Sequence, residues 1–237
     1  MSLFHDLIAA QLLRFERPVR APYDPAAGNR LLVAFVILGL VLQPALSGLA
    51  HGAGVDQESW VKSAIVVTLL LALILTVRIY VRLDFAAIGL HRWRAWTARE
   101  RLYVCTVVPL AVAAFGYVFR ERFVQLAEAR GWVGLFLVTV PTGLLWGMVQ
   151  EFIYRGLLQT ELTRRFGGIV AVLLTNLAFT FGPLHFNYIG LGADTGPRWG
   201  MFAAIFGIGL FFGILYRRSG NLWIPALLHG LWPLNMT

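Results

Sequence analysis

Four residues in the C-terminal half of the sequence, Glu151, Arg155, His185 and His229, place ionisable side chains inside otherwise apolar stretches. A carboxylate and two imidazoles in an apolar enclosure can activate a water molecule. The carboxylate or one imidazole accepts a proton from the water, and the other imidazole stabilises the oxyanion that develops on the substrate. These residue types therefore predict hydrolytic chemistry, provided that the fold brings them together.

Glu151 and Arg155 lie within the run WGMVQEFIYRGLLQTE, which has the composition of a membrane-spanning helix. An ionisable group at bilayer depth costs roughly 2.5 to 3.5 kcal/mol on insertion scales, so its presence needs a reason. The two residues are four apart, which puts them on one helix face and within reach of an ion pair. Such a pair is either a buried clamp between helices or part of a functional site, and we favour the site.

The two histidines are ambiguous when each is taken alone. His185 ends the run NLAFTFGPLH, where Phe181 is expected one turn before it on the same face and Gly182-Pro183 should loosen the helix. An isolated histidine at such a place is typical of a membrane interface. His229 lies in LWIPALLHGLW, away from charged residues, and fits a hydrogen bond between helices as well as a site.

Other chemistries are less well supported. Glu151, His185 and His229 could bind Zn²⁺ with one position open for water, but no H-E-x-x-H pattern is present, so we favour a site without metal or other cofactor. No G-x-S-x-G pattern indicates a serine nucleophile. Cys105 lies in an apolar run with no histidine or acid near it in sequence, and is expected to be a small buried hydrophobe.

The composition is that of an integral membrane protein. Of 237 residues, 58% are hydrophobic and only 14% are charged. The net charge of +8 comes from 20 basic residues, of which Lys62 is the one lysine, and most arginines lie between apolar runs. Such arginines contact anionic lipid headgroups, so membrane lipids are the expected partners and nucleic acid is not.

We therefore expect an all-α, polytopic integral membrane protein with about seven transmembrane helices around an intramembrane cavity. A helix needs about 20 apolar residues to cross the bilayer. The expected spans are residues 31–50, 61–81, 102–119, 133–160, 169–186, 200–216 and 222–236. Residues 1–29 form an amphipathic surface segment and an extended linker without a removable signal peptide, residues 30–129 form the N-terminal transmembrane helices, and residues 130–237 form the core that carries the site.

The arginines also orient the spans, because cytoplasmic loops are rich in Lys and Arg. They favour a cytoplasmic N-terminus and a C-terminus on the opposite side of the cell (inner) membrane. Arg120, Arg122 and Arg130 are exceptions, because this orientation puts them on the non-cytoplasmic side. At 1.5 Å per residue, Glu151 and His229 fall at similar depths, about 20 and 16 Å from the nearest cytoplasmic arginines. His185 falls about 10 Å too far, unless its helix starts after Gly167-Gly168 or tilts strongly.

The order of QEFIYR at 150–155, FGPLH at 181–185 and His229 in the last span resembles the CPBP family of CAAX-prenyl-protease and bacteriocin-processing (Abi-type) intramembrane proteases. The family pattern has two acidic residues and an arginine, then F-x-x-x-H, then H-x-x-x-N. The resemblance covers roughly residues 130–236 and is supported by RGLLQTEL and RRSGNLWIP.

This resemblance implies a membrane endopeptidase that cleaves near the C-terminus of membrane-anchored, lipidated or sorting-signal substrates. Glu151 matches the second acid of the family, Arg155 the arginine, His185 the histidine that activates water, and His229 the histidine of the oxyanion hole. Two positions depart from the pattern: Gln150 stands at the first acid, and Pro233 stands at the final asparagine.

Gln150 cannot act as a base, because a carboxamide does not take up a proton near neutral pH. Either Glu151 has taken over, although neighbouring helical residues point about 100° apart, or hydrolysis is lost. Asn187 and Asn235 are candidates for the missing amide because they follow the two histidines in sequence.

Two function classes therefore remain open. The first, which we favour, is an intramembrane endopeptidase in which Glu151 and His185 activate water and His229 serves the oxyanion. The second is a non-catalytic relative that acts as a membrane scaffold, chaperone or bacteriocin-immunity protein. A transporter is disfavoured because the two halves of the sequence show no repeat.

Overall fold

The computed structural model describes residues 15, 24–52, 60–185 and 199–231, and the regular elements among these residues are all helical. The expected all-α class is therefore confirmed. The surface segment expected before residue 24 lies almost entirely outside the described residues. Asn187, Pro233 and Asn235 also lie outside them, and their roles stay predictions.

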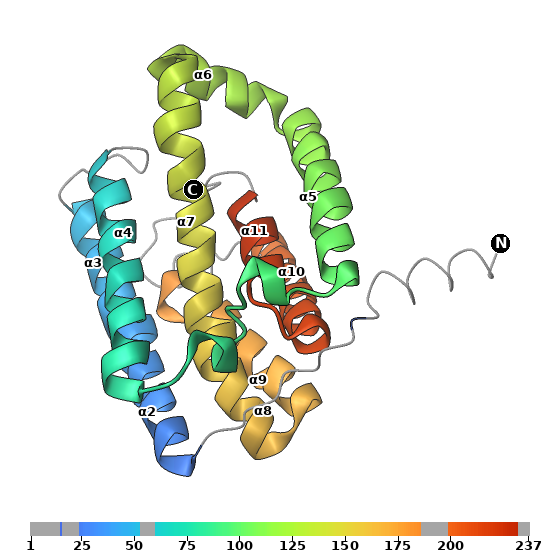
Figure 1. Cartoon of the computed structure of the whole chain (residues 1–237). Coiled ribbons are helices and arrows are strands. Elements are labelled where there is room, and N and C mark those ends of the chain that lie inside the picture. The colour runs from blue at the N-terminus through green and yellow to red at the C-terminus, as the bar shows by residue number, and fades with distance from the viewer. Residues whose placement is uncertain (1–14, 16–23, 53–59, 186–198, 232–237) are drawn as a thin grey trace.

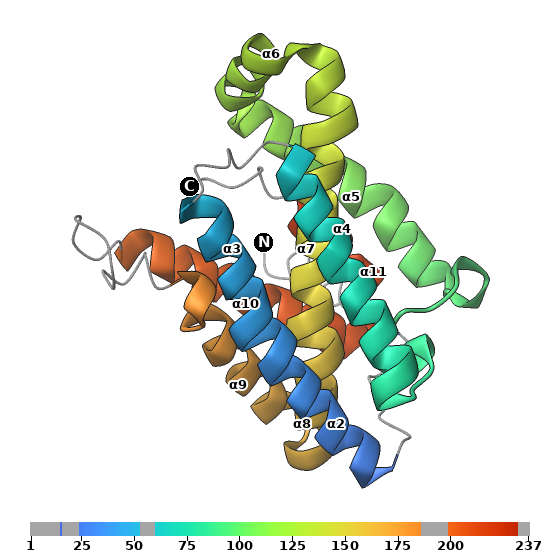
Figure 2. The same ribbon diagram turned by 90° about the vertical axis from the view of Figure 1, so that its left-hand side faces the viewer.

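The first half of the described chain forms three long helical rods. The first consists of α2 (Pro25–Phe35), π-helical η1 (Val36–Leu42) and α3 (Gln43–Gly52), and the second of α4 (Trp60–Leu75) and π-helical η2 (Thr76–Val81). A loop with the short 3₁₀ turns η3 (Phe85–Ile88) and η4 (Trp93–Ala95) leads to α5 (Ala98–Val118). Figure 2 shows the first two rods side by side along the length of the protein.

The second half carries the candidate site. It consists of α6 (Arg120–Gly134), π-helical η5 (Leu135–Thr139), α7 (Val140–Glu151), π-helical η6 (Phe152–Gln159), α8 (Thr160–Phe166), α9 (Gly168–Thr180), α10 (Trp199–Ser219) and α11 (Trp223–Leu231). The α7–η6 rod is central: it contacts α2, α4, α9 and α11, and Figure 1 shows it between the first two rods and the C-terminal helices.

Five helices are long and apolar enough to cross a membrane, among the residues that the structure describes. They are Pro25–Leu49, Trp60–Val81, Ala98–Val118, Arg120–Phe166 and Trp199–Ser219. The expected fifth and seventh spans correspond to shorter described helices, α9 with 13 residues and α11 with 9. The protein is thus a polytopic membrane protein. Five of the seven expected spans correspond to described helices that are long enough to cross a membrane.

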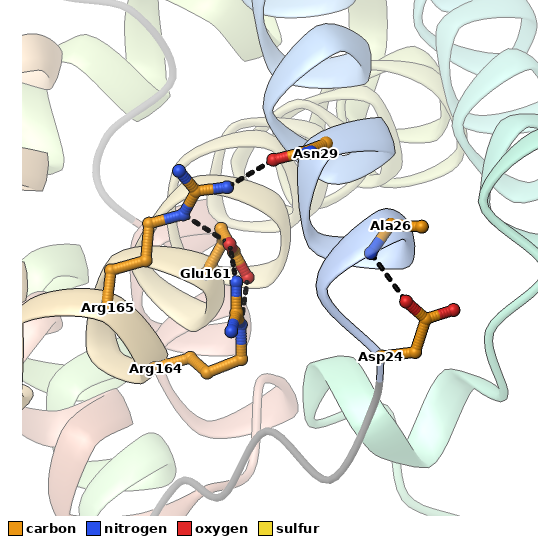
Figure 3. Close-up of polar contacts among 6 residues, drawn as sticks. All are labelled: Asp24, Ala26, Asn29, Glu161, Arg164 and Arg165. Carbon is orange, nitrogen blue, oxygen red and sulfur yellow. Dashed lines mark hydrogen bonds and ion pairs between the residues drawn. The ribbon is translucent and has the colours of Figure 1, made fainter.

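The first helix begins earlier than the sequence predicted. The linker was expected to extend to residue 29, but α2 starts at Pro25. Asp24 accepts a hydrogen bond from the backbone N–H of Ala26 at 2.6 Å (Figure 3), and proline fits the first turn of a helix because no hydrogen bond is lost there. The N-cap therefore overrides the turn-forming composition of this segment.

Several polar groups lie inside the bundle and many large apolar side chains face outward, as expected for a protein in lipid. Glu151, Arg155, Gln159 and Asn176 are buried, whereas large apolar side chains are exposed on every long rod. Examples are Val41, Leu71, Leu110 and Leu137. The prediction that Cys105 is buried is wrong: it is exposed on α5, because this helix lies at the edge of the bundle and turns most of its surface outward.

An ionic cluster around the buried Glu161 joins the first helix to the end of the central rod (Figure 3). The Glu161 carboxylate is fully buried and accepts hydrogen bonds from Arg164 and Arg165, while Arg165 also donates to the side chain of Asn29. Gly28 lets the carboxylate approach, since a Cβ there would lie within 2.4 Å of its oxygens. This cluster fixes α2 against α8.

The loop between η2 and α5 holds the start of α11. The backbone N–H of Leu222 donates to the Gly89 carbonyl at 2.8 Å, His91 Nε2 donates to the Gly220 carbonyl at 2.9 Å, and the Trp223 indole donates to the His91 carbonyl at 3.1 Å. These bonds set the position from which α11 runs back toward the central rod.

Replacing Gly89 with alanine is expected to destabilise the protein by about 2–4 kcal/mol. Gly89 has φ +85°, and a Cβ there would lie 2.7 Å from the Tyr216 ring and 3.0 Å from the Gly220 carbonyl oxygen. Equilibrium unfolding in mixed micelles measures the change. Gly207→Ala is the control, because nothing lies within 4 Å of a Cβ at Gly207. Equal stability of the two variants would contradict the tight packing of this loop.

Candidate active site

Glu151 is the last residue of α7, at the point where the central rod changes from α-helical to π-helical geometry. π-Helical segments are rare and often occur at functional sites. Glu151 Oε1 lies 3.1 Å from Arg155 Nη1, and both side chains are fully buried. The ion pair expected from the spacing is therefore present.

Arg155 is held by more than its carboxylate partner. Its Nη2 donates to the backbone carbonyl of Gly209 at 2.8 Å, and its guanidinium carbon lies 4.8 Å from the centre of the Phe179 ring. The bond to Gly209 joins the central rod to α10, and the ring face offers a further favourable contact for the cation. These contacts fix the guanidinium, which in turn orients Glu151.

His229 completes a chain of three charged or ionisable groups. Its Nδ1 lies 2.7 Å from Glu151 Oε1, and its ring stacks on Phe212 with 5.1 Å between ring centres. A carboxylate can only accept, so Nδ1 carries the hydrogen in this bond. In the neutral imidazole, Nε2 is then an unprotonated acceptor. This atom can act as a general base, and once it has taken up a proton it can donate a hydrogen bond.

Two glycines allow the close helix packing that positions His229 beside Glu151. Gly147 lies one turn before Glu151, and Gly230 directly follows His229. A Cβ on Gly147 would lie 2.4 Å from the Gly230 nitrogen, and a Cβ on Gly230 would lie 2.6 Å from the Leu144 Cα. Only glycine lets the two backbones cross so closely. The α7–α11 crossing therefore brings the histidine within hydrogen-bonding distance.

His185 lies beyond the end of α9. That helix stops at Thr180, and Gly182 leads into a 3₁₀ turn that begins at Pro183 and includes His185. His185 Nδ1 is 2.7 Å from the Phe179 carbonyl oxygen, so Nδ1 carries the hydrogen here too, because a carbonyl only accepts. The Nε2 atom of the neutral ring is again a proton acceptor.

Phe179 links the two histidines and was missed by sequence reasoning. Its ring makes edge contacts with His185 at 5.0 Å and with His229 at 6.0 Å between ring centres. The F-x-x-x-H spacing pointed instead to Phe181, which is half exposed and packs on Phe202. The helix ends before Phe181, so the expected shared helical face with His185 does not form.

The helix before His185 is shorter than the depth argument assumed. Gly167 has φ +79°, α9 starts at Gly168 and has only 13 residues, and His185 lies on a turn beyond its end. The His185 ring reaches Phe179 from the turn after α9, the His229 ring reaches it from α11, and the Arg155 guanidinium lies over it. Glu151 joins this group through its contacts with Arg155 and His229.

Gln150 is 6% exposed beside Glu151, at the position of the first acid in the family pattern. Among the residues that the structure describes, no group of three His, Cys, Asp or Glu side chains is arranged to hold a metal ion. The chelator experiment below tests the alternative of a zinc site on Glu151, His185 and His229.

Comparison with known proteins covers the part of the chain that carries this geometry. Residues 130–234 match the family model described as "Type II CAAX prenyl endopeptidase Rce1-like". A Bacillus subtilis (strain 168) protein named "Uncharacterized protein YpbD" is 28% identical over 86 residues. The alignment covers 36% of this chain and 36% of that protein. No solved structure matches the chain.

Proposed function

We propose that the protein is an intramembrane endopeptidase, because residues 130–234 match the family model of the Rce1-like type II CAAX prenyl endopeptidases. Its substrates are membrane-anchored proteins that carry a lipid or a C-terminal sorting signal. The observation that supports this proposal most is the hydrogen bond between buried Glu151 and His229 inside the matched region. It couples a carboxylate to an imidazole, as acid–base catalysis requires.

Water activation falls to His185 and Glu151. The Nε2 atom of His185 accepts a proton while the water oxygen attacks the carbonyl carbon of the scissile peptide. Glu151 Oε1 is occupied by Arg155 and His229, but Oε2 is buried without a hydrogen-bond partner among the described residues. This oxygen accepts a hydrogen bond from the second O–H of the water, which stays on the tetrahedral intermediate, and the Glu151 carboxylate thereby takes part without Gln150.

His229 stabilises the oxyanion. When its Nε2 carries a proton, the imidazolium charge is balanced by Glu151 at 2.7 Å, and Nε2–H donates to the oxygen of the tetrahedral intermediate. The C–N bond then breaks, the proton held by His185 goes to the leaving amine, and a carboxylic acid and an amine are released. No metal is needed for this sequence, and zinc bound by Glu151, His185 and His229 is the alternative.

The surroundings support a substrate that arrives from the bilayer. The outer faces of the long helices are apolar, so lipid chains and a lipidated segment are suitable neighbours. The arginine bias supports a cell (inner) membrane location with the N-terminus in the cytoplasm and the C-terminus on the opposite side.

A second function is favoured by one observation, the carboxamide of Gln150 at the first acid of the family pattern. If Glu151 does not replace that acid, the protein binds lipidated or transmembrane peptides without cleaving them. It would then act as a scaffold, chaperone or bacteriocin-immunity protein.

The deciding experiment uses the purified protein in bilayers with a panel of prenylated and membrane-anchored peptides. We expect cleavage by the wild type, unaffected by chelator, and a loss of about 10²–10⁴-fold in His185→Ala. Cys105→Ala is the control and should cleave normally, because Cys105 is exposed on the outer face of α5. A folded wild type that binds peptides but cleaves none would favour the non-catalytic function.

A further inference from the structure

The hydrogen-bond donors of the two histidines are engaged in the structure. Each Nδ1–H donates within the protein, to the Phe179 carbonyl in His185 and to Glu151 in His229. Glu151 Oε2 is an acceptor. A scissile carbonyl that becomes an oxyanion needs hydrogen-bond donors before any histidine has taken up a proton. A second donor beside His229 would stabilise the carbonyl oxygen from the start of the attack.

Tyr154 has an uncommitted donor. Its side chain is fully buried, and its hydroxyl has no hydrogen-bond partner among the described residues. The ring is clamped between Phe35 and Phe179, with edge contacts of 5.6 and 5.1 Å between ring centres. Buried polar groups without a partner are rare in folded proteins, and such a group calls for an explanation. A substrate that completes the bond is one.

The Tyr154 hydroxyl also lies close to the residues that hold the two histidines. Phe179, whose ring packs edge-on against Tyr154, also contacts both histidines. A Cβ on Gly182 would lie 3.1 Å from Tyr154 Oη, and Gly182 accepts the hydrogen bond from the His185 backbone. Tyr154 is one turn beyond Gln150 on the central rod, and both are buried. The phenol therefore lies beside the non-helical turn that carries His185.

We propose that Tyr154 is a catalytic residue that donates its O–H to the carbonyl oxygen of the scissile peptide. This inference rests on the proposed endopeptidase function. As water adds, the C=O electron pair moves onto the oxygen, which accepts the hydrogen bond from Tyr154 Oη. The phenol keeps its proton throughout, and the bond weakens again when the C–N bond breaks and the carbonyl re-forms.

Tyr154→Phe removes this one oxygen and tests the proposal. We expect kcat to fall about 100-fold, with KM changed by less than about threefold. Stability should not fall, because the lost hydroxyl has no hydrogen-bond partner among the residues that the structure describes. The matched control is Tyr216→Phe, whose buried hydroxyl bonds to Thr160 at 2.8 Å and to the Ile88 carbonyl at 3.0 Å. That variant should lose stability and keep its kcat.

Each outcome decides the inference. If the wild type cleaves and Tyr154→Phe cleaves equally fast, the role of Tyr154 is overturned while the endopeptidase function stands. If the wild type cleaves no peptide, the endopeptidase function fails, and binding of a farnesylated peptide aldehyde decides about Tyr154. Affinity for the aldehyde at least tenfold weaker in Tyr154→Phe, with equal affinity for the matching alcohol, supports a donor at this oxygen. Equal aldehyde affinity overturns it.

Discussion

Replacing Glu151 with glutamine is expected to abolish cleavage and to destabilise the folded protein by about 3–5 kcal/mol. Arg155 would remain buried with its charge uncompensated, since the carboxylate 3.1 Å away is its ion-pair partner within the site. His229 would lose the group that holds its Nδ1–H. Equilibrium unfolding in mixed micelles and peptide cleavage in bilayers measure the two effects separately.

The double variant Glu151→Gln/Arg155→Met separates the structural effect from the catalytic one. Removing both buried charges should recover most of the stability, because apolar replacement of a buried pair is often neutral. Cleavage should not recover, since no carboxylate orients His229. A double variant as unstable as the single one would contradict the account of Arg155 as an unpaired charge.

Gly147→Ala is expected to lower cleavage by about 100-fold and stability by about 1–3 kcal/mol. The new methyl group would lie 2.4 Å from the Gly230 nitrogen and 2.6 Å from its Cα, and backbone atoms cannot rotate away as a side chain can. Helix α11 must move outward by about 1 Å to reach ordinary contact distance. The 2.7 Å bond between His229 and Glu151 would then be lost.

Gly116→Ala is the matched control for this change. Gly116 lies inside α5, and nothing is within 4 Å of a Cβ built there. Alanine favours a helix over glycine by roughly 0.5–1 kcal/mol, so stability should hold or rise and cleavage should stay the same. If Gly147→Ala behaved like Gly116→Ala, the close crossing of α7 and α11 would not be what positions His229.

Part of the candidate site follows from the sequence because the bilayer limits the choices. A charged residue inside an apolar helix needs a partner, and the spacing of Glu151 and Arg155 supplies one on the same face. The similar depths of Glu151 and His229 made their contact a reasonable expectation. Both relations use only the regular rise and rotation of a helix, which a sequence determines well.

The remaining features depend on where helices end and how closely they cross. Phe181 was expected to share a face with His185, but the helix stops at Thr180 and Phe179 takes that place. The approach of Gly147 to Gly230 depends on packing between segments 83 residues apart in sequence. Tyr154 gave no signal among the many aromatic residues, since an unpartnered hydroxyl can be recognised only in three dimensions.

The most direct test of the central claim is mass spectrometry of a prenylated, membrane-anchored peptide incubated with the wild-type protein in bilayers prepared in H₂¹⁸O. The account predicts a shortened peptide with one ¹⁸O in its new C-terminal carboxylate, formed equally with and without chelator and absent with His229→Ala. Intact peptide after prolonged incubation with folded wild type, across a panel of anchors and C-terminal sequences, would contradict the claim that Glu151, His185 and His229 form a hydrolytic site.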